Sequence, residues 1–97
     1  MGKQVFDQYS LLHYAAGIVA YFWDIGAWKW FAFHMGFELI ENSKFGIDFI
    51  NTQLTWWPGG KPRADGFENI LGDNLSAMFG WWAAYQLDGI GKRRGWY

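Results

Sequence analysis

The sequence predicts an all-α fold: a small polytopic membrane helix bundle with about three transmembrane helices and an interfacial helix or loop. Two observations support this. Aromatic residues make up 23% of the 97 residues, whereas only 18% are charged, and Trp and Tyr favour membrane interfaces. Apolar stretches with helical spacing also recur between short polar breaks. The mean hydropathy of -0.12 opposes the prediction, partly because the hydropathy scale treats Trp and Tyr as slightly polar.

The first two predicted spans cover residues 9–23 and 27–42. Ser10 is a candidate cap for the first span, and Asp24-Ile25-Gly26 predicts the turn between them. Each span is shorter than the roughly 20 residues that cross a bilayer core. We therefore expect flanking aromatic residues to lengthen both spans, and contacts between small residues to hold them as a tight antiparallel hairpin.

The rest of the chain is predicted as a connector (43–64), a third span (65–87) and a basic tail (88–97), all in one membrane domain, 1–97. The connector contains both prolines, and its apolar spacing from residue 45 to 54 predicts a short interfacial helix or an irregular loop. The tail carries three consecutive basic residues, Lys92 to Arg94. We expect them to contact lipid headgroups or solvent.

Polar residues recur at helical spacing inside all three spans, so each span carries one polar stripe. The stripes are His13, Gly17, Ala20 and Asp24 in the first span, His34, Glu38 and Glu41 in the second, and Asp65, Asn69, Asp73, Ser76 and Gly80 in the third. Ionisable groups at membrane depth are costly unless they are paired or face a cavity. We therefore expect the three stripes to face a common interior.

This arrangement defines a candidate polar or binding cluster of His13, His34, Glu38, Glu41, Asn42, Asp65, Asn69 and Asp73. Simpler interpretations remain for several members. His34 and Glu38 are compatible with a hydrogen-bonded pair that only fixes helix packing. Asp65 is compatible with a helix N-cap, and Glu41 and Asn42 with a solvated helix end. Asp73, two turns inside an apolar helix, has no such simple alternative.

Three parts of the sequence resemble a known family: Asp7 with His13, residues 34–43 (HMGFELIENS) and residues 65–80 (DGFENILGDNLSAMFG). In the order and spacing of these polar residues the chain is similar to short VanZ-like membrane proteins and related small bacterial inner-membrane proteins. The resemblance covers most of residues 7–88. It implies a helical membrane protein whose polar cluster matters, in a bacterial inner membrane or a viral or host membrane, and it implies no reaction.

Two functions follow from the cluster. In the first, the protein binds a membrane lipid or a lipid-linked headgroup: His13 and His34 donate to a phosphate or act as general acid–base groups, and Glu38 and Asp73 orient them. Carboxylates repel a phosphate unless a cation intervenes. The second function is therefore a divalent metal site, with His13, His34, Glu38 and Asp73 as ligands of types that Zn, Mn or Fe accept.

Other classes stay open. The chain is compatible with a structural or accessory subunit of a larger membrane assembly, with self-association, and with a soluble aromatic-rich binding module. The net charge of -1 does not suggest nucleic acid as a partner. The absence of cysteine excludes disulfides and thiolate metal sites. The N-terminal residues lack the basic region and cleavage pattern of a secretory signal.

Overall fold

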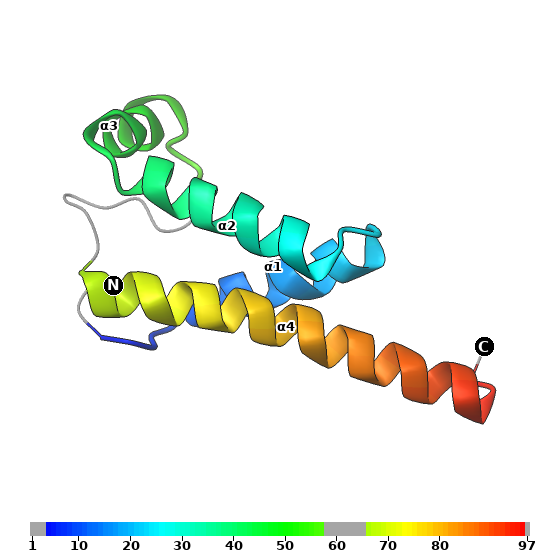
Figure 1. Ribbon diagram of the computed structural model, residues 1–97. Helices are drawn as coiled ribbons and strands as arrows, with labels where there is room; N and C mark the ends of the chain where they lie inside the picture. Colours follow the sequence, from blue (N-terminus) through cyan, green and yellow to red (C-terminus); the bar gives the residue numbers. More distant parts are fainter. Residues whose placement is uncertain (1–3, 58–65, 97) are drawn as a thin grey trace.

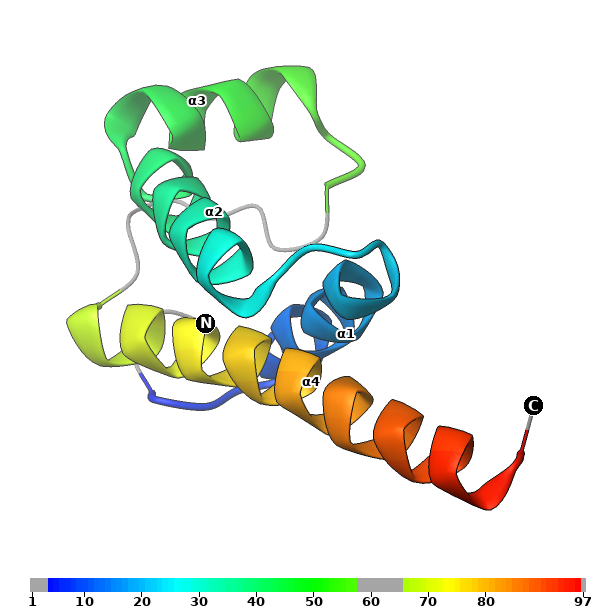
Figure 2. The same ribbon diagram turned by 45° about the vertical axis from the view of Figure 1, so that its right-hand side comes forward.

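The computed structural model describes residues 4–57 and 66–96, which form four helices. Figures 1 and 2 show α1 and α4 packed side by side, α2 lying across them, and α3 folded against the end of α2. The last turns of α4 extend beyond the other helices (Figure 1), so the molecule is elongated, 48 × 25 × 22 Å. The bounds are α1 Ser10–Phe22, α2 Ala27–Glu41, α3 Lys44–Gln53 and α4 Phe67–Arg94.

The prediction of transmembrane helices is wrong. Among the helices of the described residues, none combines the length with the apolar character that crossing a bilayer requires. With 13 and 15 residues, α1 and α2 are short. The 28 residues of α4 are long enough, but polar and charged side chains interrupt them throughout. The predicted membrane bundle, and the integral-membrane location inferred from it, are therefore corrected to an all-α arrangement of four helices.

Local signals explain where the helices begin and end. The turn after α1 contains Asp24 in the left-handed region (φ 62°), a conformation that Asp adopts more readily than most residues. Ser43 caps α3, because its Oγ accepts a hydrogen bond from the Gly46 amide at 3.0 Å. The first half of the predicted connector is thus helical, whereas its assignment as an interfacial segment belongs to the membrane bundle that is corrected above.

The residues predicted as a basic tail are mostly the last turns of α4. This helix continues to Arg94 and ends at Gly95, which adopts the left-handed conformation (φ 69°) common at helix C-termini. Lys92 to Arg94 lie in its last turn, where positive charge complements the partial negative charge of the helix end. This favourable placement explains why the helix does not stop near residue 87.

Two glycines allow the backbones of α1 and α4 to touch. A Cβ atom added at Gly17 would lie 2.0 Å from the carbonyl oxygen of Ala77, and one added at Gly80 would lie 1.9 Å from that of Tyr14. No side chain larger than hydrogen fits at either position without movement of backbone. The two glycines therefore set the register in which α1 packs on α4.

The interior of the described chain contains more polar than apolar side chains. The buried apolar residues of the described chain are few and mostly small: Ala20, Trp30, Ala77 and Ala84. The buried polar residues are His34, Glu38, Asn69, Asp73, Asn74 and Ser76. Many large apolar side chains are exposed instead, among them Leu71, Leu75, Phe79 and Trp82 along one face of α4. Buried polar side chains are uncommon and normally form hydrogen bonds, so the partner of each one has to be identified.

Candidate metal centre

Three helices bring ionisable side chains to one point in the interior. His13 comes from α1, and His34 and Glu38 from α2, where a spacing of four residues places them on one face. Asp73 and its neighbour Asn74 come from α4. Glu38 and His34 are buried, and His13 is partly exposed, with 14% of its side-chain surface accessible.

One atom from each of three residues converges at the centre of the cluster. His13 Nδ1 lies 2.8 Å from His34 Nε2 and 3.6 Å from Glu38 Oε1. His34 Nε2 lies 3.9 Å from the same oxygen. In the described residues these three side chains form the one group of His, Cys, Asp or Glu with ligand atoms close enough to hold a metal ion. We call His13, His34 and Glu38 the triad.

The outer ring nitrogens of both histidines face acceptors on α4. His13 Nε2 lies 3.3 Å from Asp73 Oδ2, and His34 Nδ1 lies 2.9 Å from Asn74 Oδ1. The Asn74 amide is oriented by its own Nδ2, which donates to the Ile70 carbonyl at 3.0 Å. Since a carboxylate and an amide oxygen only accept, both outer nitrogens carry hydrogen.

With both outer nitrogens protonated, the two inner nitrogens need a positive charge between them. If both histidines are neutral, their inner nitrogens present lone pairs to each other at 2.8 Å, beside the Glu38 carboxylate. Such an arrangement is repulsive unless a cation lies between the three atoms. That cation is either an extra proton on one imidazole or a metal ion.

The pKa values of the two histidines shift in opposite directions. Burial lowers the pKa of His13, but the hydrogen bond and charge of Asp73, with the charges of Glu38 and Glu41, outweigh it and raise the pKa above its usual 6.5. Burial lowers the pKa of His34; the Asn74 hydrogen bond raises it, His13 lowers it and Asp73 raises it, and the net shift is downward. Without a metal, His13 therefore takes up the extra proton before His34 does.

The other predicted site residues lie around the triad or away from it. Asn42 Nδ2 donates to Glu38 Oε2 at 3.0 Å. Glu41 acts on His13 only through its charge and is not part of the group of ligand atoms. Asn69 contacts the N-terminal segment, with its Nδ2 2.7 Å from the Gln4 carbonyl and 3.1 Å from Asp7 Oδ2. Asp65 lies outside the described residues.

Asp73 was predicted as a metal ligand, but its carboxylate meets the outer nitrogen of His13, whereas the triad uses the inner one. Its second oxygen, Oδ1, is buried and makes no hydrogen bond with the described residues. Asn74 was not among the predicted residues, although it completes the contact to His34. The sequence carried one signal for Asn74, which is that it directly follows Asp73 on the same helix. Consecutive helical residues point in different directions, so Asp73 can meet His13 of α1 while Asn74 meets His34 of α2.

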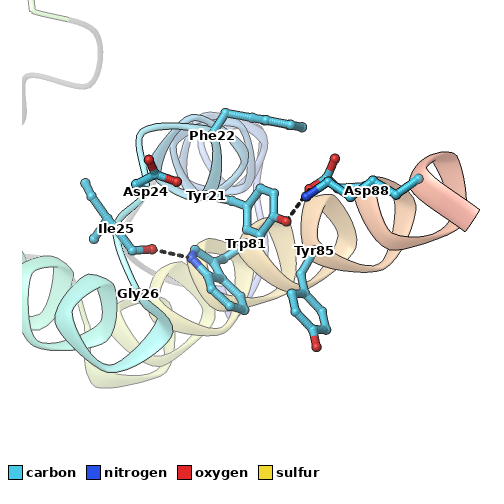
Figure 3. Close-up of a pocket in the computed structure, with 9 residues that line it drawn as sticks. Tyr21, Phe22, Asp24, Ile25, Gly26, Trp81, Tyr85 and Asp88 are labelled. Carbon is cyan, nitrogen blue, oxygen red and sulfur yellow. Dashed lines mark hydrogen bonds and ion pairs between the residues drawn. The ribbon is translucent and has the colours of Figure 1, made fainter. Parts of the chain in front are cut away.

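A separate hollow of about 350 Å³ lies where the end of α1 meets the second half of α4. Figure 3 shows Trp81 donating from Nε1 to the Ile25 carbonyl (2.8 Å) and the Tyr21 hydroxyl directed at Asp88. Phe22, Asp24, Gly26, Tyr85 and Lys92 complete its lining. None of the triad residues lines it, so the hollow and the triad are different places.

Comparison with models of protein families, with curated proteins and with solved structures finds no match to this chain. The resemblance to VanZ-like proteins therefore stays a prediction, and the geometry of the triad is the guide to function.

Proposed function

We propose that this protein binds a divalent transition-metal ion such as Zn²⁺ through His13 Nδ1, His34 Nε2 and Glu38 Oε1. The observation that carries the proposal is the convergence of two imidazole nitrogens and one carboxylate oxygen on a single point. Imidazole and carboxylate are ligand types that Zn²⁺ accepts. A thiolate-free set of this kind also admits Mn²⁺ or Fe²⁺.

The spacing of the three atoms matches the size of the ion. Separations of 2.8, 3.6 and 3.9 Å define a triangle with one point about 2.0 Å from all three atoms, which is the usual distance from zinc to His nitrogen or carboxylate oxygen. An ion at that point needs little rearrangement of the side chains. It also supplies the positive charge that the facing lone pairs require.

The contacts to Asp73 and Asn74 add independent support. A histidine that binds a metal almost always donates its other ring N–H to a carboxylate or a carbonyl, which fixes the tautomer and the ring orientation. Both histidines of the triad have such a partner on α4. These contacts also engage the outward N–H groups, so a role in which His13 and His34 donate to a phosphate is less well supported.

Calorimetric titration of the metal-depleted protein with Zn²⁺ near neutral pH tests the proposal. We expect one ion per chain in the wild type, and Glu38→Gln to weaken binding at least about tenfold because the charged ligand is lost. Glu68→Gln is the matched control, since Glu68 is an exposed carboxylate in the first turn of α4. It should bind Zn²⁺ as the wild type does.

Urea unfolding with and without Zn²⁺ separates binding from packing. An ion present at a hundred times its Kd raises the free energy of unfolding by about 2.7 kcal/mol. We expect this increment in the wild type and in Glu68→Gln, and its loss in Glu38→Gln. If Glu38 is only a packing residue, the substitution lowers stability equally with and without zinc. Equal zinc increments in all three proteins would contradict the proposal.

A second function, as a subunit of a larger assembly or of a self-associated form, is favoured by the apolar exterior of the helices. Leu71, Leu75, Phe79 and Trp82 form a continuous exposed stripe on α4, and large exposed apolar patches commonly mark interaction sites. Sedimentation of the purified protein tests this. A concentration-independent monomer would remove self-association, and partner subunits would then have to cover the stripe.

A further inference from the structure

The triad supplies three ligand atoms, and zinc in a closed structural site has four. In residues 4–57 and 66–96, no fourth His, Cys, Asp or Glu offers an atom within the same reach. Asp73 is the nearest further carboxylate to His13, and its contact is with the outer nitrogen of that ring. An ion held by the triad therefore lacks a fourth ligand of these four residue types within the described ranges.

Glu38 does not fill the fourth position with its second oxygen. Asn42 Nδ2 donates to Glu38 Oε2 at 3.0 Å, and the same amide nitrogen lies 2.9 Å from the Glu38 carbonyl oxygen. Asn42 is thus anchored to the last turn of α2, and it holds Oε2 away from the centre. Glu38 is left to coordinate through Oε1 alone.

The triangle also determines where the vacant coordination lies. The point about 2.0 Å from all three atoms is in their plane, so an ion bound at ordinary zinc distances sits close to that plane. The free coordination positions then lie above and below the plane, and a fourth ligand approaches the ion from one of these two sides. Donor sets of two histidines and one carboxylate are those of catalytic zinc, with water in the fourth position, and of iron centres with open positions.

Charge and burial limit what that position accepts. A divalent ion with two neutral imidazoles and one carboxylate keeps one net positive charge on its ligand set. The Asp73 carboxylate, 3.3 Å from His13, partly offsets this charge, so the position accepts at most one monoanion. Glu38 and His34 have almost no accessible side-chain surface, and His13 alone is partly exposed. The incoming ligand must therefore be small. Water, hydroxide and small Lewis-basic monoanions such as azide meet both conditions.

On the basis of the metal binding proposed above, we propose that the triad forms an open metal centre. Its remaining coordination position takes water or one small monoanion. The centre is thus of the catalytic type and not of the closed structural type. Asn42 is the positioning residue that keeps the position open, because it prevents Glu38 from coordinating through both oxygens.

The test uses the full-length chain loaded with Co²⁺, which occupies zinc sites and has a visible spectrum that depends on its ligands. Sodium azide is titrated against the saturated protein, with sodium perchlorate at equal ionic strength as the control. We expect a saturable change in the visible bands with azide and none with perchlorate. A Co²⁺ spectrum that stays unchanged throughout the azide titration would overturn the open position.

Asn42→Ala provides a second readout at saturating Co²⁺. Release of Glu38 Oε2 lets it occupy the open position, and we expect azide to bind about tenfold more weakly, the scale on which outer-shell partners act. Azide affinity equal to that of the wild type would overturn the role of Asn42 and the open position derived from it. Failure of Co²⁺ and Zn²⁺ to bind at all refutes the metal site itself, so the two failures are distinguishable.

Discussion

Replacement of Gly17 by alanine should damage both the fold and the proposed metal centre. The added Cβ would lie 2.0 Å from the Ala77 carbonyl oxygen and 2.8 Å from the Trp81 amide nitrogen. Ordinary contact begins near 3.4 Å, so α1 and α4 must separate locally by about 1.4 Å in an interior packed as densely as a crystal. Both obstructing atoms belong to the backbone, and no side-chain rotation relieves the clash.

The loss of stability has two sources, overpacking at the added methyl group and the weakening of one polar contact. Overpacking a close-packed interior costs about 1–3 kcal/mol, and separation of the helices also lengthens the 3.3 Å contact between His13 and Asp73. We therefore expect Gly17→Ala to lower the free energy of unfolding by about 2–4 kcal/mol. Because His13 lies one turn before Gly17 on the same helix, the affinity for Zn²⁺ should fall at least about tenfold.

Urea unfolding of the metal-free protein measures the first effect, and zinc titration measures the second. Gly36→Ala is the matched control, because no atom lies within 4 Å of the Cβ it adds to the middle of α2. This control should be more stable than the wild type by about 0.5–1 kcal/mol, since glycine is unfavourable inside a helix. A Gly17→Ala protein with wild-type stability would refute the close approach of α1 and α4.

Three further predictions concern the surroundings of the triad. Asp73→Asn should weaken Zn²⁺ binding about tenfold, measured by calorimetry; an unchanged affinity would exclude Asp73 as the residue that orients His13. In the metal-free protein the raised pKa of His13 stabilises the fold below pH 6.5, and the benefit is lost as pH rises through the raised value. The stability advantage of wild type over His13→Gln should therefore shrink as the pH rises above 6.5 in urea unfolding, and a constant difference would contradict this. Trp81→Phe leaves the Ile25 carbonyl without its 2.8 Å hydrogen bond and should cost about 1–2 kcal/mol, whereas an unchanged unfolding midpoint would show that this contact is dispensable.

Metal binding requires the two histidines and Glu38 to lose their protons. Zinc affinity should thus decrease as pH falls below 7, and a pH-independent affinity would contradict coordination by the two histidines.

Helix faces and helix ends depend on residues that are close in the sequence, so they could be predicted from the sequence alone. A spacing of four residues places His34 and Glu38 on one face of any helix, and Asp24, Asn42 and Ser43 mark helix ends by local hydrogen bonding and backbone preference. The membrane prediction failed because composition counts apolar side chains without showing whether one helix collects enough of them. In this chain the apolar side chains are divided among several helices, which also carry buried polar residues, and none of the described helices is long and apolar enough to cross a membrane.

The identity of the contacting atoms was decided only by the tertiary structure. Helical periodicity gives the direction of a side chain, not the partner on another helix, and so it grouped Asn69 with the triad and omitted Asn74. The register between α1 and α4 depends on the close approach at Gly17 and Gly80. That register brings Asp73 to His13 and leaves Asn69 beside Gln4 and Asp7. A shift of α1 along α4 by one helical turn, about 5.4 Å, would separate His13 from Asp73; the sequence therefore determined the residue types of the cluster, and helix packing determined which of their atoms meet.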